Sequence, residues 1–155
     1  MDFLHQLSAA QGYVELGMHL DANDELEQIS PEYRASPPAL AIRLQIYRAL
    51  KKWELMQIVA VQLVKADPNE VQWAISLAYA TRRAESIPAA KCILENAVEN
   101  HAKEPLLHYN LACYECQLGN MEQAKQRLTK AFNLDPNCRL MALEDEDLEP
   151  LWSSL

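Results

Sequence analysis

The sequence predicts an all-α solenoid made of stacked helix–turn–helix units. The main observation is a period of 34 residues: when the sequence is shifted by 34 positions, apolar and small residues align with residues of the same kind. Leu77, Ala90 and Ala97 align with Leu111, Ala124 and Ala131. A fixed period of this length is typical of proteins in which each unit buries its apolar face against its neighbours. The composition agrees, with 50% hydrophobic residues, 23% charged residues and only three glycines in 155 residues.

Four repeat frames account for most of the chain, over residues 3–36, 37–70, 71–104 and 105–138. Each frame has apolar residues at helical spacing on both sides of a central break, which predicts two amphipathic helices. In the first three frames the expected helices cover residues 4–16 and 22–29, 39–50 and 53–65, and 73–83 and 86–99. In the fourth frame they lie on either side of Gly119-Asn120, with apolar residues at helical spacing: Leu107, Leu111, Tyr114 and Leu118, then Ala124, Leu128, Ala131 and Phe132.

Local signals set the ends of several of these helices. Gly17 and Gly119 are expected to end first helices, because glycine adopts a positive φ without a Cβ clash. Ser86 is the expected N-cap of a second helix. Asp135-Pro136 ends the last repeat, since proline disfavours a helical residue before it. Pro31 cuts the second helix of the first frame short, and residues 31–38 are expected to form an irregular connection.

Residues 139–155 break the period and are expected to form a C-terminal cap. A helix is expected over 139–143, and the apolar residues that should cover the last repeat are Leu143, Leu148, Leu151 and Trp152. The acidic run over 144–149 is expected to be a solvated surface of this cap. The alternative is that these acids reach a groove lined by arginines on a neighbouring copy, which would give self-association or autoinhibition.

The pattern resembles the tetratricopeptide repeat (TPR) family, in the form of a small soluble protein of bacterial type. That family has small residues where its helices cross, a glycine between them and Asp-Pro at the end; the matching residues are Ala112, Gly119, Ala124, Ala131 and Asp135-Pro136. The second frame departs from the pattern, because Leu44, Met56 and Leu63 fill the small positions. The resemblance implies a right-handed superhelix of about four repeats, forming one domain over residues 1–155.

The same resemblance implies a concave groove, lined by the first helices, that binds a peptide or a helix of another protein. The residues expected to line it and bind the partner are Gln45, Arg48, Gln72, Ser76, Tyr79, Arg82, Arg83, Tyr109 and Asn110. Three of them are arginines, which bind carboxylates in a bidentate way, so the hypothesis is an acidic or C-terminal-carboxylate peptide. The alternative is that the arginines are solvated or pair with Glu85 and Glu115, in exposed pairs worth about 0–1 kcal/mol.

No catalytic, cofactor or metal site is expected. Cys113 and Cys116 form a C-x-x-C pair, but a structural zinc site usually needs a second such pair, and the sequence has none. The four cysteines are therefore expected to be free packing thiols in a reducing compartment. A Gly-rich phosphate loop, a G-x-S-x-G motif and an H-E-x-x-H motif are all missing from the sequence.

Charge and hydropathy favour a cytoplasmic protein that binds proteins. The net charge of −8 disfavours non-specific nucleic-acid binding, and no apolar run reaches the roughly 18 residues of a membrane span. The expected function is a non-enzymatic scaffold or adaptor. The alternatives are a dedicated chaperone for a secreted or assembly-prone client, similar to type III secretion class II chaperones, and a regulatory or self-assembling structural subunit.

Overall fold

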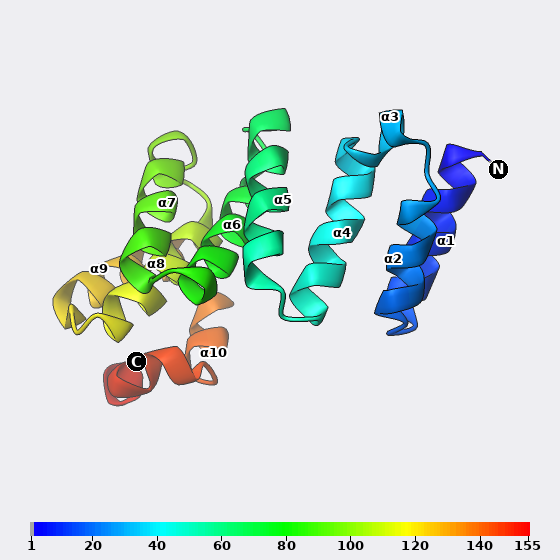
Figure 1. Cartoon of the computed structure of the whole chain (residues 1–155). Coiled ribbons are helices and arrows are strands. Elements are labelled where there is room, and N and C mark those ends of the chain that lie inside the picture. The colour runs from blue at the N-terminus through cyan, green and yellow to red at the C-terminus, as the bar shows by residue number, and fades with distance from the viewer. Residues whose placement is uncertain (1) are drawn as a thin grey trace. The chain divides into compact units, whose positions relative to one another are not determined.

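The computed structural model describes residues 2–155, which form helices joined by short turns and contain no strand (Figure 1). This confirms the predicted all-α class. The helices are α1 Phe3–Glu15, α2 His19–Glu27, α3 Pro31–Arg34, α4 Pro37–Ala49, α5 Trp53–Ala66, α6 Val71–Ala84, α7 Ile87–Asn100, α8 Pro105–Gln117, α9 Met121–Leu134, α10 Cys138–Ala142 and the 3₁₀ helix η1 Glu146–Ser154.

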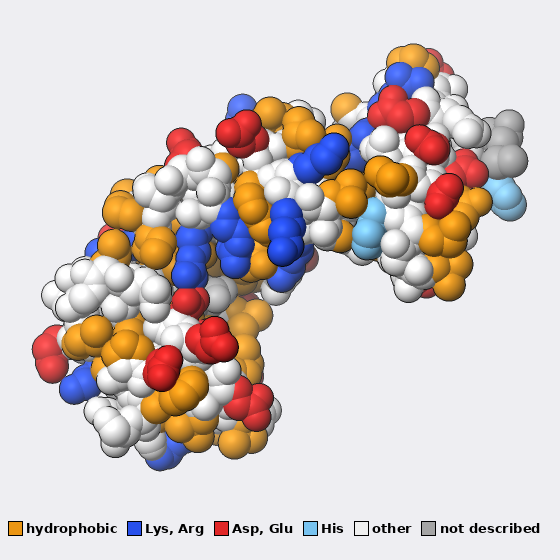
Figure 2. Space-filling view, turned by 60° about the horizontal axis from the view of Figure 1, so that its bottom comes forward, with side chains coloured by type: hydrophobic (Ala, Val, Ile, Leu, Met, Phe, Trp, Pro, Cys, Tyr) orange, Lys and Arg blue, Asp and Glu red, His pale blue; other side chains and the backbone are white. Residues whose placement is uncertain are grey.

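The chain forms two compact units, and the boundary between Ala80 and Thr81 falls within α6. Hydrophobic, basic and acidic side chains all reach the surface (Figure 2). The organisation of residues 1–155 as one repeat domain stays a prediction.

The N-terminal unit contains two apolar clusters. In the first, α1, α2 and α4 pack together around fully buried side chains that include Leu26, Ile29 and Ile46. In the second, α4 and α5 enclose Met56 and Leu63, which are also fully buried. The large residues that replace the family's small ones in the second frame are therefore core residues.

The same type of turn joins the two helices of all four pairs, α1–α2, α4–α5, α6–α7 and α8–α9. The amide at positions 18, 52, 86 and 120 donates to the carbonyl oxygen five residues earlier, at N···O distances of 2.8 to 3.1 Å. The preceding position has a positive φ in three of these turns: +75° at Gly17, +83° at Gly119 and 57° at Lys51. This confirms both glycine stops and shows that Lys51, which is not a glycine, adopts the same left-handed conformation.

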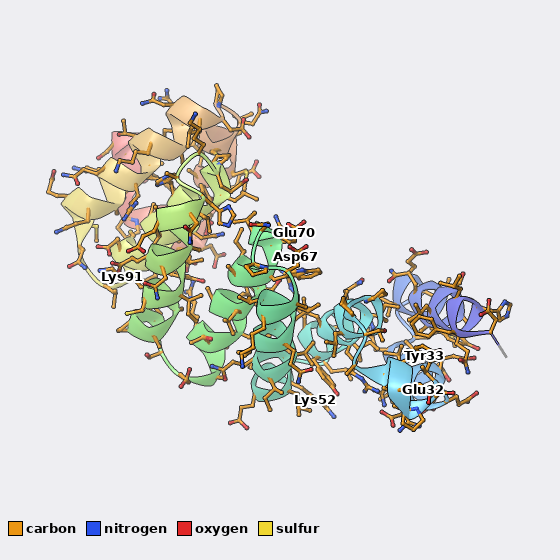
Figure 3. All side chains as sticks on the ribbon, turned by 90° about the horizontal axis from the view of Figure 1, so that it is seen from above. Glu32, Tyr33, Lys52, Asp67, Glu70 and Lys91 are labelled. Atoms are coloured by element: carbon orange, nitrogen blue, oxygen red, sulfur yellow. The ribbon has the colours of Figure 1, made fainter. Side chains whose placement is uncertain are left out.

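Two prolines begin helices in the segment 31–38, where an irregular connection was predicted. Pro31 opens the short helix α3 and Pro37 opens α4, because a proline in the first turn lacks only an amide hydrogen that has no helical partner. The expected irregular connection over 31–38 is therefore wrong. The ring of Tyr33 (labelled in Figure 3) stacks on Phe3 with the centroids 4.9 Å apart. Arg34 Nε donates to the carbonyl oxygen of Ile29 at 2.7 Å, which fixes α3 against the chain before it.

Other helix ends differ from the prediction by a few residues. Helix α2 begins at His19, three residues before the expected start, and α6 begins at Val71, two residues before it. Ser86 caps α7 as predicted, since its Oγ accepts from the amide of Ala89 at 3.2 Å. Helix α7 also carries Lys91, labelled in Figure 3.

Helix α8 is the centre of the C-terminal unit. It packs against α7, α9 and η1, and nine of its thirteen residues are buried, from Leu107 to Cys116 with the exception of Asn110. A helix that is buried on most of its circumference needs few charges, and α8 has one acidic residue, Glu115, and no Lys or Arg.

The cap folds onto this unit through α10 and η1, drawn orange to red in Figure 1. Leu148 and Leu151 are buried, and Trp152 Nε1 donates to the carbonyl oxygen of Ala142 at 2.8 Å. These residues confirm the predicted cap. The assignment of Leu143 to it is wrong, because this side chain is 42% exposed at the end of α10.

Candidate protein-interaction site

The nine residues predicted to bind a partner lie on first helices of the repeats and are divided between the two units. In the N-terminal unit they are Gln45 and Arg48 on α4 and Gln72, Ser76 and Tyr79 on α6. In the C-terminal unit they are Arg82 and Arg83 at the end of α6 and Tyr109 and Asn110 on α8.

In the N-terminal unit the structure brings Arg48 and Tyr79 together. The guanidinium carbon of Arg48 lies 4.4 Å from the centroid of the Tyr79 ring, and the ring of Trp53 meets Tyr79 edge-on at 5.6 Å. Arg48 is exposed, so this cation–π contact is worth about 0.5–1 kcal/mol. The result is a basic group on an aromatic platform at the protein surface.

The other three residues of this unit have separate surroundings. Gln45 is exposed, and its Nε2 donates to Gln11 Oε1 at 3.3 Å. Gln72 is exposed near the start of α6, where its backbone amide donates to Glu70 Oε1 at 3.2 Å. Glu70 and Asp67 are labelled in Figure 3, in the turn between α5 and α6. Ser76 is half-buried.

In the C-terminal unit Arg82 is bound by an acidic residue of the cap. Its two terminal nitrogens reach the two carboxylate oxygens of Asp147, at 2.6 and 2.9 Å, in a bidentate ion pair. The hydrogen bond to Asp147 raises the pKa of Arg82 against the opposing effect of burial. Both side chains are largely covered, at 20% and 29% exposed, so bulk water screens this pair less than a pair on the open surface.

Tyr109 binds the second carboxylate of the same segment. Its hydroxyl donates to Asp145 Oδ2 at 2.8 Å, and its side chain is 4% exposed rather than open to a groove. Burial, followed by this hydrogen bond, raises the pKa of Tyr109, so the phenol stays a donor at neutral pH. Gln117 Nε2 donates to the backbone oxygen of Asp147 at 2.9 Å. The end of α6 and one face of α8 therefore hold an Asp-x-Asp segment of the same chain.

These contacts correct two expectations about charge. Asp145 and Asp147 face α8 and the end of α6 rather than forming a solvated surface; Glu144, Glu146 and Glu149 are exposed as expected. Glu115 does not pair with the arginines, because its Oε1 forms an ion pair with Lys91. Arg83 is exposed and Asn110 is half-buried.

The same contacts bring together three potential metal ligands. Cys113 Sγ and one carboxylate oxygen each of Asp145 and Asp147 lie within 4.8 Å of one another. Cys113 Sγ donates to Asp145 Oδ2 at 3.6 Å, and burial, followed by the charge of Asp145, raises the pKa of this thiol. Arg82 already supplies a cation to Asp147. The chemistry of the cluster therefore suits an ion-paired contact between chain segments better than a metal.

Sequence reasoning missed Asp145 and Asp147 as members of this site. Asp145 has one recognisable local signal: its Oδ1 accepts from the amide of Asp147 at 3.0 Å and so caps η1. The partner of Asp145, Tyr109 on α8, lies 36 residues away in the sequence, and the partner of Asp147, Arg82 on α6, lies 65 residues away. No local pattern indicates either pairing.

None of the helices over residues 2–155 is long and apolar enough to cross a membrane. No known family profile and no curated protein sequence matches the chain.

Solved structures do resemble it. A chain named MamA MSR-1 C2 matches with a TM-score of 0.74 and 20% identity, over 88% of this chain and 79% of its own length. MamA RS-1 ArsTM double mutant matches with a TM-score of 0.75 and 17% identity, over 85% and 74%. MamA D159K mutant 1 matches with a TM-score of 0.70 and 20% identity, over 87% and 78%. At these identities the likeness concerns the fold alone, and it confirms the predicted fold class, an all-α solenoid of TPR-like helix pairs.

Proposed function

We propose that this chain is a non-enzymatic, cytoplasmic protein-interaction scaffold whose first helices bind an acidic segment of a partner protein. The observation that supports the proposal is the acidic segment already bound in the C-terminal unit. There, Arg82 and Tyr109 each hold a carboxylate, and Gln117 holds a backbone carbonyl oxygen. Two of these three residues are among those that the sequence assigned to partner binding.

The chemistry of these side chains explains why an acidic segment suits them. A guanidinium presents parallel N–H donors that match both oxygens of a carboxylate, and charge-assisted hydrogen bonds are stronger than neutral ones. The N-terminal unit offers a second arginine, Arg48, oriented by the ring of Tyr79. Because the protein carries a net charge of −8, attraction to an acidic partner must come from such local basic groups.

Affinity capture from a native lysate tests the proposal. Wild-type protein is compared with Arg48→Ala/Arg82→Ala and with the control Lys65→Ala/Lys130→Ala, which removes the same charge from exposed positions on α5 and α9. We expect a protein that wild type and the control capture and that the arginine variant loses. Capture should also weaken as salt rises, since exposed ion pairs are screened. Equal capture by all three chains, or no capture by wild type, would contradict the proposal.

A further inference from the structure

We infer that the C-terminal segment over residues 145–151 is an internal occupant of the site, and that a partner's Asp-x-Asp segment must displace it to bind. This inference rests on the proposed function, because it names the ligand class and the regulation of the same site. It follows from three features of the bound segment: its polar contacts, its apolar contacts and its helix type.

The polar contacts define what the site recognises. Two carboxylates, separated by one residue, meet different donors: Asp145 meets the hydroxyl of Tyr109, and Asp147 meets the guanidinium of Arg82. The amide of Gln117 binds the backbone of the second aspartate rather than its side chain. A site that binds two carboxylates and the main-chain carbonyl of the second aspartate selects an acidic peptide in a turn-like conformation.

The apolar contacts extend this requirement toward the C-terminus. Leu148 follows the second aspartate and is fully buried, and Leu151 is 3% exposed. The residues between and around them, Glu146, Glu149 and Pro150, are exposed. The segment therefore docks as a ligand would: two carboxylates followed by two leucines face the protein, and the residues between them face solvent.

The helix type explains how the segment can leave. The element η1 is a 3₁₀ helix of nine residues that contains Pro150. Runs of 3₁₀ helix longer than about 3–4 residues are uncommon, because their hydrogen bonds have poorer geometry. The segment thus depends on its contacts with α6 and α8 rather than on its own backbone. As a tethered ligand it competes at an effective concentration on the order of millimolar.

A direct binding measurement tests the inference with the full-length chain. The probe is a labelled synthetic peptide with the sequence of residues 143–155, LEDEDLEPLWSSL. The proteins are wild type, Asp145→Asn/Asp147→Asn, and the control Glu144→Gln/Glu146→Gln, which removes two exposed charges from the same segment. We expect the aspartate variant to bind the probe at least tenfold more tightly than wild type, and the control to bind like wild type.

Two further arms check that the carboxylates carry the recognition. Adding Arg82→Ala to the aspartate variant should weaken probe binding at least tenfold, and so should replacing both aspartates of the probe by asparagine. Leu151→Ser provides a second way to release the segment and should also raise affinity for the probe. Faster hydrogen exchange over residues 144–155, with an unchanged helical signal, identifies release rather than unfolding in both variants.

Several outcomes would overturn the inference. These are equal affinity of wild type and both released variants for the probe, no effect of Arg82→Ala, and a wild-type dimer that the aspartate substitutions convert to a monomer. The last result would mean that two copies exchange the segment. If partner capture depends on Arg48 and Arg82 but the probe binds wild type and the aspartate variant equally well, this inference alone is refuted. Probe binding without any captured partner refutes the proposed function alone.

Discussion

The ion pair between Lys91 on α7 and Glu115 on α8 leads to a quantitative prediction about stability. Glu115 is 3% exposed; its Oε1 pairs with Lys91, and its Oε2 has no hydrogen-bond partner among residues 2–155. Replacing Lys91 by Met keeps the aliphatic packing but leaves a buried carboxylate with no cation. Removing one partner of a fully buried pair typically costs about 3–5 kcal/mol. The Lys91 side chain is 27% exposed, so water can partly replace it, and we expect a loss of about 2–4 kcal/mol.

The assay is urea unfolding followed by helical circular dichroism, with hydrogen exchange to locate the loss in α7 and α8. The matched control is Lys91→Met/Glu115→Gln, which removes the buried charge as well. We expect the double variant to recover at least about 1 kcal/mol relative to Lys91→Met, as coupled neighbours do.

The pH dependence of the Lys91 contribution follows from the direction of its shift. The hydrogen bond to Glu115 raises the pKa of Lys91, so its stabilising effect is complete below the unfolded-state pKa of about 10.4. That effect is lost only as the pH rises through the higher folded-state pKa. The Lys91 contribution should therefore be the same at pH 7 and pH 9. A loss below 1 kcal/mol in Lys91→Met, or strictly additive effects in the double variant, would refute the reasoning.

Three further predictions concern turns, caps and thiols. Lys51→Gly should raise the free energy of unfolding by about 1 kcal/mol, because a left-handed residue with a Cβ is strained, whereas Gly119→Ala should lower it by about 1–2 kcal/mol for the same reason. Urea midpoints measure both, and shifts of the same sign would contradict the common turn. Ser86→Ala should cost about 1 kcal/mol through loss of the N-cap bond to α7, and Ser86→Thr, which keeps a hydroxyl, should cost less. Iodoacetamide at pH 8 should label the exposed Cys92 well before Cys113, because Cys113 is buried and burial raises the pKa of its thiol. Mass spectrometry of digests measures the two labelling rates, and equal rates would contradict the burial of Cys113.

The helix pairs were predictable because their causes are local. The period of 34 residues places each apolar face, and Gly17, Gly119 and Ser86 act on helix ends within a few residues of themselves. The sequence placed a break at residues 51–52, but it did not indicate the positive φ at Lys51, since a lysine carries no signal for it. It also did not indicate α3, because proline both ends and begins helices and its neighbours decide which.

The candidate site was only half predictable. Periodicity placed Arg48 and Tyr79 on first helices, and their contact follows from the packing of α4 and α5 with α6 in the N-terminal unit. The same reasoning placed Tyr109 among the residues that line an open groove, whereas its side chain is buried and bonds to Asp145 of the cap. A helical pattern shows which side of a helix a residue occupies, but it does not show what covers that side.

The sequence by itself determined the all-α repeat class, the positions of most helices and the choice of basic residues on first helices. Local hydrogen bonds, backbone conformations and apolar spacing cause these features, and each acts over fewer than about 15 residues. Only the tertiary structure decided where the acidic C-terminal segment goes. Arg82 and Asp147 are separated by 65 residues, and their ion pair forms because buried Leu148 and Leu151 hold η1 against α8. Such a pairing depends on how the chain folds back in three dimensions, and no periodicity in the sequence encodes it.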